Sequence, residues 1–286
     1  MASVAKSAAI LKAFTPAVTE LSVRQVAMRT EIPRSTAHAL CQTMAQSGLL
    51  EVSPRGYRLG PLLLELGGRV IERTGLVHAA EGILARLIRS AEAEAHLGQL
   101  AQGWIVYLDR ETGGRRVPML NRVGQRAPAH LTGCGRAAMS WLPFDQVRPL
   151  VLRCCAEERQ PLPDLGVLRD ELARARLDGY VVSRSYQRDR TSVAAAIFDA
   201  GQQPVGGVSI AGPAAIFTNS TLSAARDSVV EAARAITARL VQHEPYAPLA
   251  RVPQQAAAPL LAESPQNLSP SKNWPRPWGA ASFFAA

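Results

Sequence analysis

One stretch of the sequence, residues 22–59, constrains the fold more than any other. Ser22 followed by Gln25 is the pattern of a capping box, which predicts that a helix begins there. A turn over residues 30–32 precedes Pro33, whose fixed φ and missing N–H suit a first helical position. Two short helices joined by a tight turn are typical of a helix-turn-helix.

The second helix of this stretch is expected to end at Ser47, because Gly48 readily adopts the left-handed conformation of a helix cap. Its apolar positions recur at helical spacing and share one face: Ala37, Leu40, Cys41 and Met44. The opposite face is polar and basic and has no carboxylate; it carries Arg34, Ser35, Thr36, His38, Gln42 and Thr43. Such a face offers hydrogen-bond donors to phosphates and base edges, so it is the predicted DNA-reading surface.

A β-hairpin is predicted next, because two short apolar runs flank Ser53-Pro54-Arg55-Gly56. Helix, turn, helix and hairpin in this order make a winged helix-turn-helix, which places its second helix in the major groove. Arg24, Arg55 and Arg58 complete the predicted DNA-binding set, the last two as phosphate contacts. The alternative is a three-helix packing unit that binds nothing.

Length and charge agree with a two-domain DNA-binding protein. The 286 residues suggest two domains, and 47% hydrophobic with 19% charged residues is ordinary for a soluble globular protein. The formal charge of +9 suits a polyanionic partner. Within residues 1–74, nine Lys and Arg face five Glu, so the placement of the charges matters more than their excess.

The four cysteines predict reduced thiols rather than a disulfide or metal framework. Cys41, Cys134, Cys154 and Cys155 form no C-x-x-C pair, and no histidine lies at zinc-ligand spacing. We therefore expect no metal, no cofactor and a cytoplasmic protein. With no signal peptide and no apolar run of 18 residues, no membrane span is expected either.

Beyond the hairpin, the chain predicts a linker helix and a second, α+β domain. The linker helix, 62–73, carries an apolar stripe of Leu62, Leu63, Leu66 and Val70, which could pair with a second copy or pack on the chain's own second domain. Helices are expected at 4–14, with Ala8, Ile10 and Leu11 inward, and at 76–93, 137–141, 145–155, 168–177 and 222–240; strands are expected at 95–100, 104–109, 117–122, 180–182, 192–198 and 205–210. Residues 245–286 hold eight prolines and ten alanines and predict a disordered tail.

Several short motifs over residues 4–240 together resemble the IclR family of bacterial transcriptional regulators. In chain order they are Ile32-Pro33-Arg34-Ser35-Thr36-Ala37-His38, Gly48-Leu49-Leu50, Tyr57-Arg58-Leu59-Gly60, Arg126-Ala127-Pro128-Ala129-His130-Leu131-Thr132-Gly133-Cys134-Gly135-Arg136-Ala137, Asp178-Gly179-Tyr180-Val181-Val182 and Ser209-Ile210-Ala211-Gly212-Pro213. The resemblance implies a winged helix over 1–60, a linker helix over 61–75 and a GAF-like effector-binding domain over 76–244. It also implies dimers or tetramers that bind a small organic acid, and the stretch 122–137 looks most similar to regulators of aromatic-acid pathways.

The resemblance places the effector site at the loop after Pro128 and on two later strands. The implied residues are Thr132, Gly133, Cys134, Gly135, Ser183, Ser192, Ser209 and Ala211. Independently of the family, N–H groups at a helix start with glycines beside them can hold a carboxylate. The alternative is a tight loop that only turns the chain.

The chain departs from the family within this site. The family commonly has cysteine, proline and serine where Ser192, Ala196 and Ala211 stand, and acidic residues where Ser183, Ser185 and Tyr186 stand. The identity of the effector is therefore open. Arg184, Arg188 and Arg190 read as a solvated strand edge, with contact to a ligand carboxylate as the alternative.

Enzyme signatures are absent from the sequence. Residues 207–212 have the spacing G-x-S-x-x-G, one residue too long for a nucleophile elbow, and no P-loop or dinucleotide fingerprint occurs. His130 near Cys134 lacks an orienting third group. The sequence predicts a non-enzymatic regulator of a catabolic operon that binds double-stranded operator DNA and a small carboxylate. The alternative is a small-molecule sensor that acts through protein partners and uses its winged helix only for dimerisation.

Overall fold

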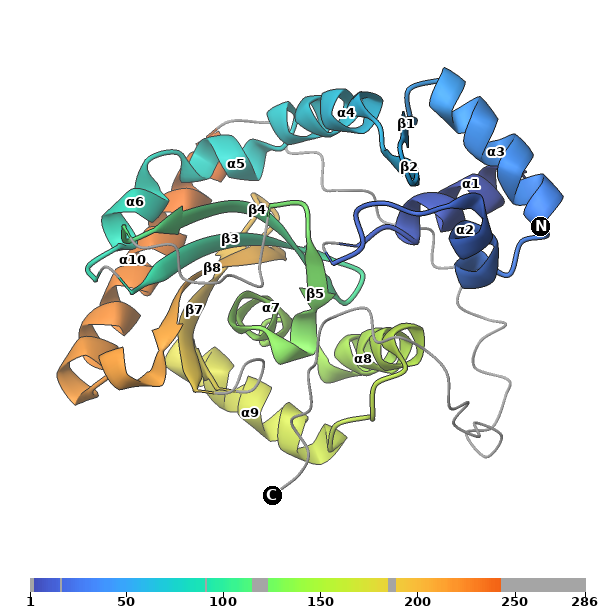
Figure 1. The fold of residues 1–286 in the computed structure, drawn as a ribbon. Helices are drawn as coiled ribbons and strands as arrows, with labels where there is room; N and C mark the ends of the chain where they lie inside the picture. Colours follow the sequence, from blue (N-terminus) through green and yellow to red (C-terminus); the bar gives the residue numbers. More distant parts are fainter. Residues whose placement is uncertain (1–2, 16, 91, 115–122, 185–188, 243–286) are drawn as a thin grey trace. The chain divides into compact units, whose positions relative to one another are not determined.

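The computed structural model describes residues 3–15, 17–90, 92–114, 123–184 and 189–242 (Figure 1). The chain divides into two compact units, and the boundary between Val70 and Ile71 falls within one helix. None of the helices in the described ranges is long and apolar enough to cross a membrane. The tail predicted at 245–286 and the strand predicted at 117–122 lie outside the described residues.

The first unit is a winged helix-turn-helix, as the sequence predicts. In chain order it contains α1 (Ser3–Lys12), α2 (Val23–Thr30), α3 (Arg34–Gln46), β1 (Leu50–Ser53), β2 (Gly56–Leu59) and α4 (Pro61–Glu72). Its buried core comprises Ile10, Phe14, Leu21, Val26, Ile32, Ala37, Cys41, Met44, Leu50 and Tyr57. The expectation for α1 was partly wrong: Ala8 is exposed, and Ile10 is the residue that enters this core.

Local capping fixes the ends of α2 and α3. The Gln25 N–H donates to Ser22 Oγ at 3.3 Å, and the Ser22 N–H donates to Gln25 Oε1 at 2.9 Å, which confirms the capping box. Glu31 ends α2 in the left-handed conformation, with φ 57°. Pro33 is the N-cap of α3 rather than its first helical residue, and its missing N–H leaves no donor unsatisfied there either.

The wing, β1 and β2, is tied to the body of the first unit through a glycine. Leu21 and Tyr57 form a bridge in which each N–H donates to the other's carbonyl at 2.9 Å. Gly56 has φ 144°, and a Cβ at this position would collide with the Leu21 carbonyl. Only glycine therefore lets the wing approach the chain so closely.

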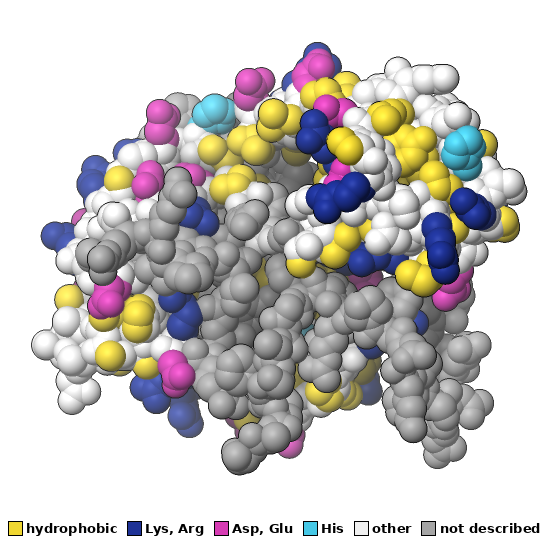
Figure 2. Space-filling model, in the orientation of Figure 1, with side chains coloured by type: hydrophobic (Ala, Val, Ile, Leu, Met, Phe, Trp, Pro, Cys, Tyr) yellow, Lys and Arg dark blue, Asp and Glu magenta, His cyan; other side chains and the backbone are white. Residues whose placement is uncertain are grey.

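Helix α4 exposes apolar side chains over most of its surface. No residue of α4 is buried; the Leu64 side chain is 81% exposed, Val70 49% and Leu66 41%. Figure 2 shows hydrophobic side chains at the surface along this helix. Leu62 and Leu63, at its start, are half-buried. The predicted stripe therefore exists but is only partly covered by its own chain.

The second unit begins with two short helices, α5 (Gly75–Ala80) and α6 (Ile83–Leu87), where the sequence predicted one continuous helix over 76–93. Gly82 adopts the left-handed conformation, with φ 68°, and interrupts the helix. The apolar periodicity continues through the break, since Leu76, Ile83 and Leu84 are all buried. Periodicity alone therefore could not show the interruption.

A six-stranded antiparallel sheet forms the centre of the second unit. Its strands are β3 (Glu94–Ala101), β4 (Trp104–Thr112), β5 (Arg126–Pro128), β6 (Val181–Ser183), β7 (Arg190–Phe198) and β8 (Pro204–Pro213), in the order β5-β4-β3-β8-β7-β6. The sequence analysis missed β5, a strand of three residues. Two 3-10 turns, η1 (Ala129–Leu131) and η2 (Ala214–Ile216), follow β5 and β8.

Helices cover both faces of this sheet (Figure 1). On one face α5, α6 and α10 (Asn219–Gln242) pack on apolar residues of β3, β7 and β8. On the other face lie α7 (Gly133–Met139), α8 (Phe144–Glu158) and α9 (Leu165–Asp178). Because side chains alternate along a strand, Ala95 and Leu97 join the α10 core while Glu94 and His96 face the α7 side.

Candidate DNA-binding surface and effector site

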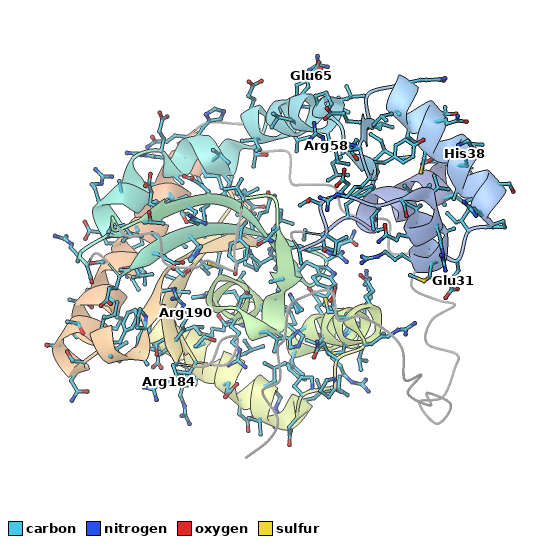
Figure 3. All side chains as sticks on the ribbon, in the orientation of Figure 1. Glu31, His38, Arg58, Glu65, Arg184 and Arg190 are labelled. Carbon is cyan, nitrogen blue, oxygen red and sulfur yellow. The ribbon has the colours of Figure 1, made fainter. Side chains whose placement is uncertain are left out.

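The outer face of α3 is open to solvent. Arg34, Ser35, His38, Gln42 and Thr43 are exposed and Thr36 is half-buried, while the expected core residues Ala37, Cys41 and Met44 are buried. No acidic residue occurs in α3 (Figure 3 labels His38). The Thr43 hydroxyl donates to the Ala39 carbonyl at 3.0 Å, so its oxygen remains as an acceptor. The face thus combines donors and acceptors without fixed negative charge.

The two arginines of the wing are both ion-paired in the free protein. Arg55 Nε donates to Glu20 Oε2 at 2.7 Å, although the Arg55 side chain stays 86% exposed. Arg58 forms a two-pronged pair with Glu51, its cross-strand neighbour, with Nε–Oε2 at 2.9 Å and Nη2–Oε1 at 2.6 Å. The sequence analysis counted these arginines as phosphate contacts and overlooked their acidic partners. Arg24, on α2, is exposed.

Neighbouring polar and charged groups hold Glu20 and Glu51 in their charged form. The pKa of Glu20 is lowered first by the nearby Ser53 hydroxyl and then by Arg55. The pKa of Glu51 is lowered first by its hydrogen bond from Arg58. Both wing arginines therefore lie beside charged carboxylates.

Three of the expected effector-site residues lie in one row across the sheet. The backbone register pairs Ser183 with Ser192, Ser192 with Ala211, and Ala211 with Glu94. The next row on the same face pairs Ser209 with Ala194 on one side and His96 on the other. Ser183, Ser192, Ser209 and Ala211 thus share one sheet face, the face that α7 covers.

Helix α7 starts at Gly133, four residues before the expected position, and its first turn lies on this face. Thr132 is the N-cap, and its Oγ1 accepts a hydrogen bond from the Gly135 N–H at 3.1 Å. Gly133, Cys134 and Gly135 are therefore inside the helix rather than in a loop before it. The N–H groups of a helix's first turn have no acceptor within the helix, so those of Gly133 and Cys134 have to find an acceptor outside it.

Direct contacts join α7 to the strands. A Cβ added to Gly133 would lie 2.7 Å from Ser192 Oγ, so a larger residue at this position would displace the serine hydroxyl. Cys134 Sγ donates to Ser209 Oγ at 3.2 Å. Burial raises the pKa of the Cys134 thiol to about 11, so the thiol is neutral and acts as a donor.

The structure separates the cysteine and histidine that could have suggested nucleophilic catalysis. His130 Nε2 lies 3.8 Å from Cys155 Sγ on α8, whereas Cys134 contacts Ser209. Burial, followed by the charge of Arg136, lowers the pKa of His130 to about 4. Among the contacts that the described residues make with the Cys134 thiol, the partners are the Ser209 hydroxyl and the His96 carbonyl.

The sequence analysis missed a charged cluster beside these residues. Glu94 Oε1 accepts a hydrogen bond from Arg190 Nη2 at 2.8 Å, and His96 Nε2 lies 3.3 Å from Glu94 Oε2. Arg190 was expected on a solvated strand edge, which is wrong, because its side chain is 21% exposed and pairs with a buried carboxylate. Arg184 is exposed, as expected, and Arg188 lies outside the described residues (Figure 3). The available signal was His96 within the predicted strand 95–100, with a second polar residue, Glu94, two positions earlier and just before that strand.

Comparison with known proteins identifies the class. Residues 3–54 match the IclR helix-turn-helix domain, and residues 68–238 match the C-terminal domain of bacterial IclR transcriptional regulators. The second match alone spans more than half of the 286 residues. The chain therefore belongs to the IclR family of bacterial DNA-binding transcriptional regulators.

Individual relatives agree with this assignment. The chain is 28% identical to the HTH-type transcriptional regulator BhcR of Paracoccus denitrificans over 76% of this chain and 80% of that protein. It is 27% identical to the Pca regulon regulatory protein of Pseudomonas putida over 78% of each. An IclR homolog from Microbacterium hydrocarbonoxydans, complexed with 4-hydroxybenzoate, is similar in structure, with a TM-score of 0.70, 25% identity and coverage of 84% and 99% of the two chains. The Thermotoga maritima IclR shares the fold, with a TM-score of 0.65, 24% identity and coverage of 83% and 98%.

Proposed function

We propose that this protein reads operator DNA with the outer face of α3 and regulates a catabolic operon in response to a small organic acid. In this proposal residues 1–60 bind DNA, 61–75 link the domains, 76–244 bind the effector and 245–286 form a tail. The observation that carries it is the acid-free outer face of α3, on which Thr36 is half-buried and the other residues are exposed: Arg34, Ser35, Thr36, His38, Gln42 and Thr43. In a winged helix this helix is the one that enters the major groove.

Binding to a duplex from upstream of its own coding sequence tests the proposal, by gel shift at several salt concentrations. Replacing Gln42 with Ala should relax preference at one base pair, at a cost of about 1–3 kcal/mol there. Gln46, also exposed and one turn further along α3, provides the matched control. An equal loss by Gln42→Ala on random DNA would contradict base reading by this residue.

A second function has specific support, because both wing arginines are neutralised by carboxylates. In this alternative the protein senses a small molecule and acts through protein partners, with its winged helix used only for dimerisation. Absence of duplex binding at low ionic strength, where phosphate contacts are strongest, would favour the alternative.

The effector part of the proposal places a carboxylate at the first turn of α7. Thr132, Gly133, Cys134 and Gly135 would supply the helix start, while Ser192 and Ser209 would supply hydroxyl groups from the sheet. Ser183 and Ala211 would complete the wall of the site on the Ser192 row. The aromatic acid in the Microbacterium relative supports an aromatic effector for this chain.

We further propose that the protein is a homodimer formed through α4, or a tetramer made of two such dimers. Leu66 and Val70, on the predicted stripe, are 41% and 49% exposed in the single chain. A second copy would remove this apolar surface from water. Two-fold symmetry would also place two α3 helices on successive half-sites of an operator.

A further inference from the structure

A buried carboxylate, a buried histidine and an arginine form a cluster on the α7 side of the sheet. The side chains of Glu94, His96 and Arg190 are 4%, 2% and 21% exposed. Arg190 Nη2 donates to Glu94 Oε1 at 2.8 Å. The arginine comes from β7 and the carboxylate from β3, so the pair reaches across β8, where the small residue Ala211 is the register partner of Glu94.

This cluster adjoins the proposed effector site. Glu94 is the register partner of Ala211, which in turn is the partner of Ser192. His96 is the register partner of Ser209, whose hydroxyl accepts from Cys134. The Glu94 and His96 side chains therefore continue the same two rows that carry the serines.

One atom of the cluster lacks a hydrogen-bond partner. His96 Nε2 lies 3.3 Å from Glu94 Oε2, but the geometry falls short of a hydrogen bond, and no other described group supplies one. The His96 ring is otherwise held against the Tyr107 ring, with the centroids 5.5 Å apart. A buried polar atom of this kind is costly unless a partner satisfies it, and a ligand can be that partner.

The Glu94 carboxylate is in its charged form. Burial raises its pKa, but the nearby His96 and the charge of Arg190 lower it by more, so the net shift is downward. A charged carboxylate only accepts hydrogen bonds, and one of its oxygens, Oε2, faces the unsatisfied ring nitrogen. A group that contacts both atoms would therefore have to donate to Glu94 and accept from His96.

A hydroxyl group meets both needs at once, since it donates one hydrogen bond and accepts others. A second carboxylate on the ligand would be repelled by Glu94. An ammonium group would face Arg190 and could accept nothing from His96. The chemistry of the cluster therefore selects a hydroxyl.

We propose that the effector is a hydroxy acid whose hydroxyl sits between Glu94 and His96 while its carboxylate lies at the first turn of α7 near Ser192. This inference rests on the effector function proposed above. Ser192 and Glu94 lie two strands apart, a separation of roughly 10 Å between backbones. An aromatic ring or a chain of several carbons would fill this distance, whereas a two-carbon acid would not.

Isothermal titration calorimetry of the full-length protein with matched acids tests the inference. One pair is 4-hydroxybenzoate and benzoate, and the other is 6-hydroxyhexanoate and hexanoate. A further control, 4-methoxybenzoate, carries an oxygen that cannot donate a hydrogen bond. At least one hydroxy acid should bind tenfold or more tightly than its partner, because the partner leaves buried polar groups unpaired. The methoxy acid should resemble benzoate.

Variants then test whether Glu94 and His96 cause the preference for the hydroxy acid over its matched partner. His96→Phe keeps a ring against Tyr107 but removes the nitrogens, and Glu94→Gln removes the charge; each should reduce the preference to threefold or less. His130→Asn, which changes another buried histidine that faces Cys155, should retain it. If an acid binds but the hydroxy acid and its partner bind equally in both pairs, this inference alone would be overturned. Failure of every acid to bind would overturn the proposed effector function and this inference with it. The comparison of matched acids on the wild-type protein tests the inference even if a variant does not fold.

Discussion

At the scale of single residues, His130 makes a pH-dependent contribution to stability. Its side chain is buried, and burial followed by the charge of Arg136 lowers its pKa to about 4. In the unfolded chain a histidine titrates near 6.5. As the pH falls below 6.5, the unfolded chain therefore binds a proton that the folded protein does not, and folding loses stability until the folded pKa is reached.

We expect the free energy of unfolding to fall by about 2 kcal/mol more in the wild type than in His130→Asn between pH 6.5 and 5, since each pH unit is worth about 1.4 kcal/mol. Urea unfolding at several pH values measures this difference. Replacing the exposed His38 with Asn is the control, and that variant should retain the wild-type loss. Parallel pH curves for wild type and His130→Asn would show that this imidazole is not the titrating group.

The residue scale also shows which parts of the candidate site the sequence could reveal. Gly133 and Cys134 belong to a local motif, and their contacts with Ser192 and Ser209 agree with the site expected from the resemblance. The pairing of Glu94 with Arg190 depends on the order of strands β3, β8 and β7, which no local pattern encodes. The sequence analysis consequently interpreted Arg190 as a surface charge.

At the scale of elements, the wing depends on how strongly its carboxylates hold its arginines. A surface ion pair is worth only about 0–1 kcal/mol, so a DNA phosphate can compete for Arg55, which remains 86% exposed. Arg58 is held by two hydrogen bonds to Glu51 and is harder to release. We therefore expect Arg55 to be the phosphate contact of the wing.

Replacing Arg55 with Gln should reduce the slope of log affinity against log salt by about one unit, equally on all duplexes. Glu20→Gln should tighten binding at low salt, because it removes the competing carboxylate. Arg174→Gln makes the same change of charge on an exposed site of α9 and should leave the slope unaltered. Fluorescence anisotropy over a salt series gives the slopes, and an unchanged slope for Arg55→Gln would remove this residue from the backbone contacts.

Element boundaries were predictable where the signal is local. The capping box of Ser22 and Gln25 and the left-handed Gly48, with φ 78°, mark helix ends through interactions within a few residues. At Gly82 the buried apolar residues continue through the break, so periodicity did not show the interruption. At α7 the first helical residues are Gly133, Cys134 and Gly135, whose glycines suggested a loop, so the predicted start fell four residues too late.

At the scale of the whole molecule, the exposed apolar surface of α4 favours assembly into oligomers. The helix is apolar on more than one side, because Leu64 and Leu66 are two residues apart, or about 200° around the helix, and both are exposed. Exposed apolar surface of this kind on a short helix is typical of an interface. The proposed interface uses the side that carries Leu66 and Val70.

Replacing Leu66 with Glu should halve the mass of the assembly, from two 30.6-kDa chains to one or from four to two, because the α4 interface would have to bury a charge. Light scattering after gel filtration gives the mass. Leu177→Glu is the matched control, because Leu177 is 88% exposed on α9 and should tolerate the charge without change of mass. Affinity for an operator with two half-sites should fall at least tenfold in Leu66→Glu, because binding of one winged helix no longer raises the local concentration of a second winged helix at the other half-site. Affinity for a single half-site should not change. Two results would contradict assembly through α4: a wild-type protein with the mass of one chain, or a Leu66→Glu variant with the same mass as the wild type.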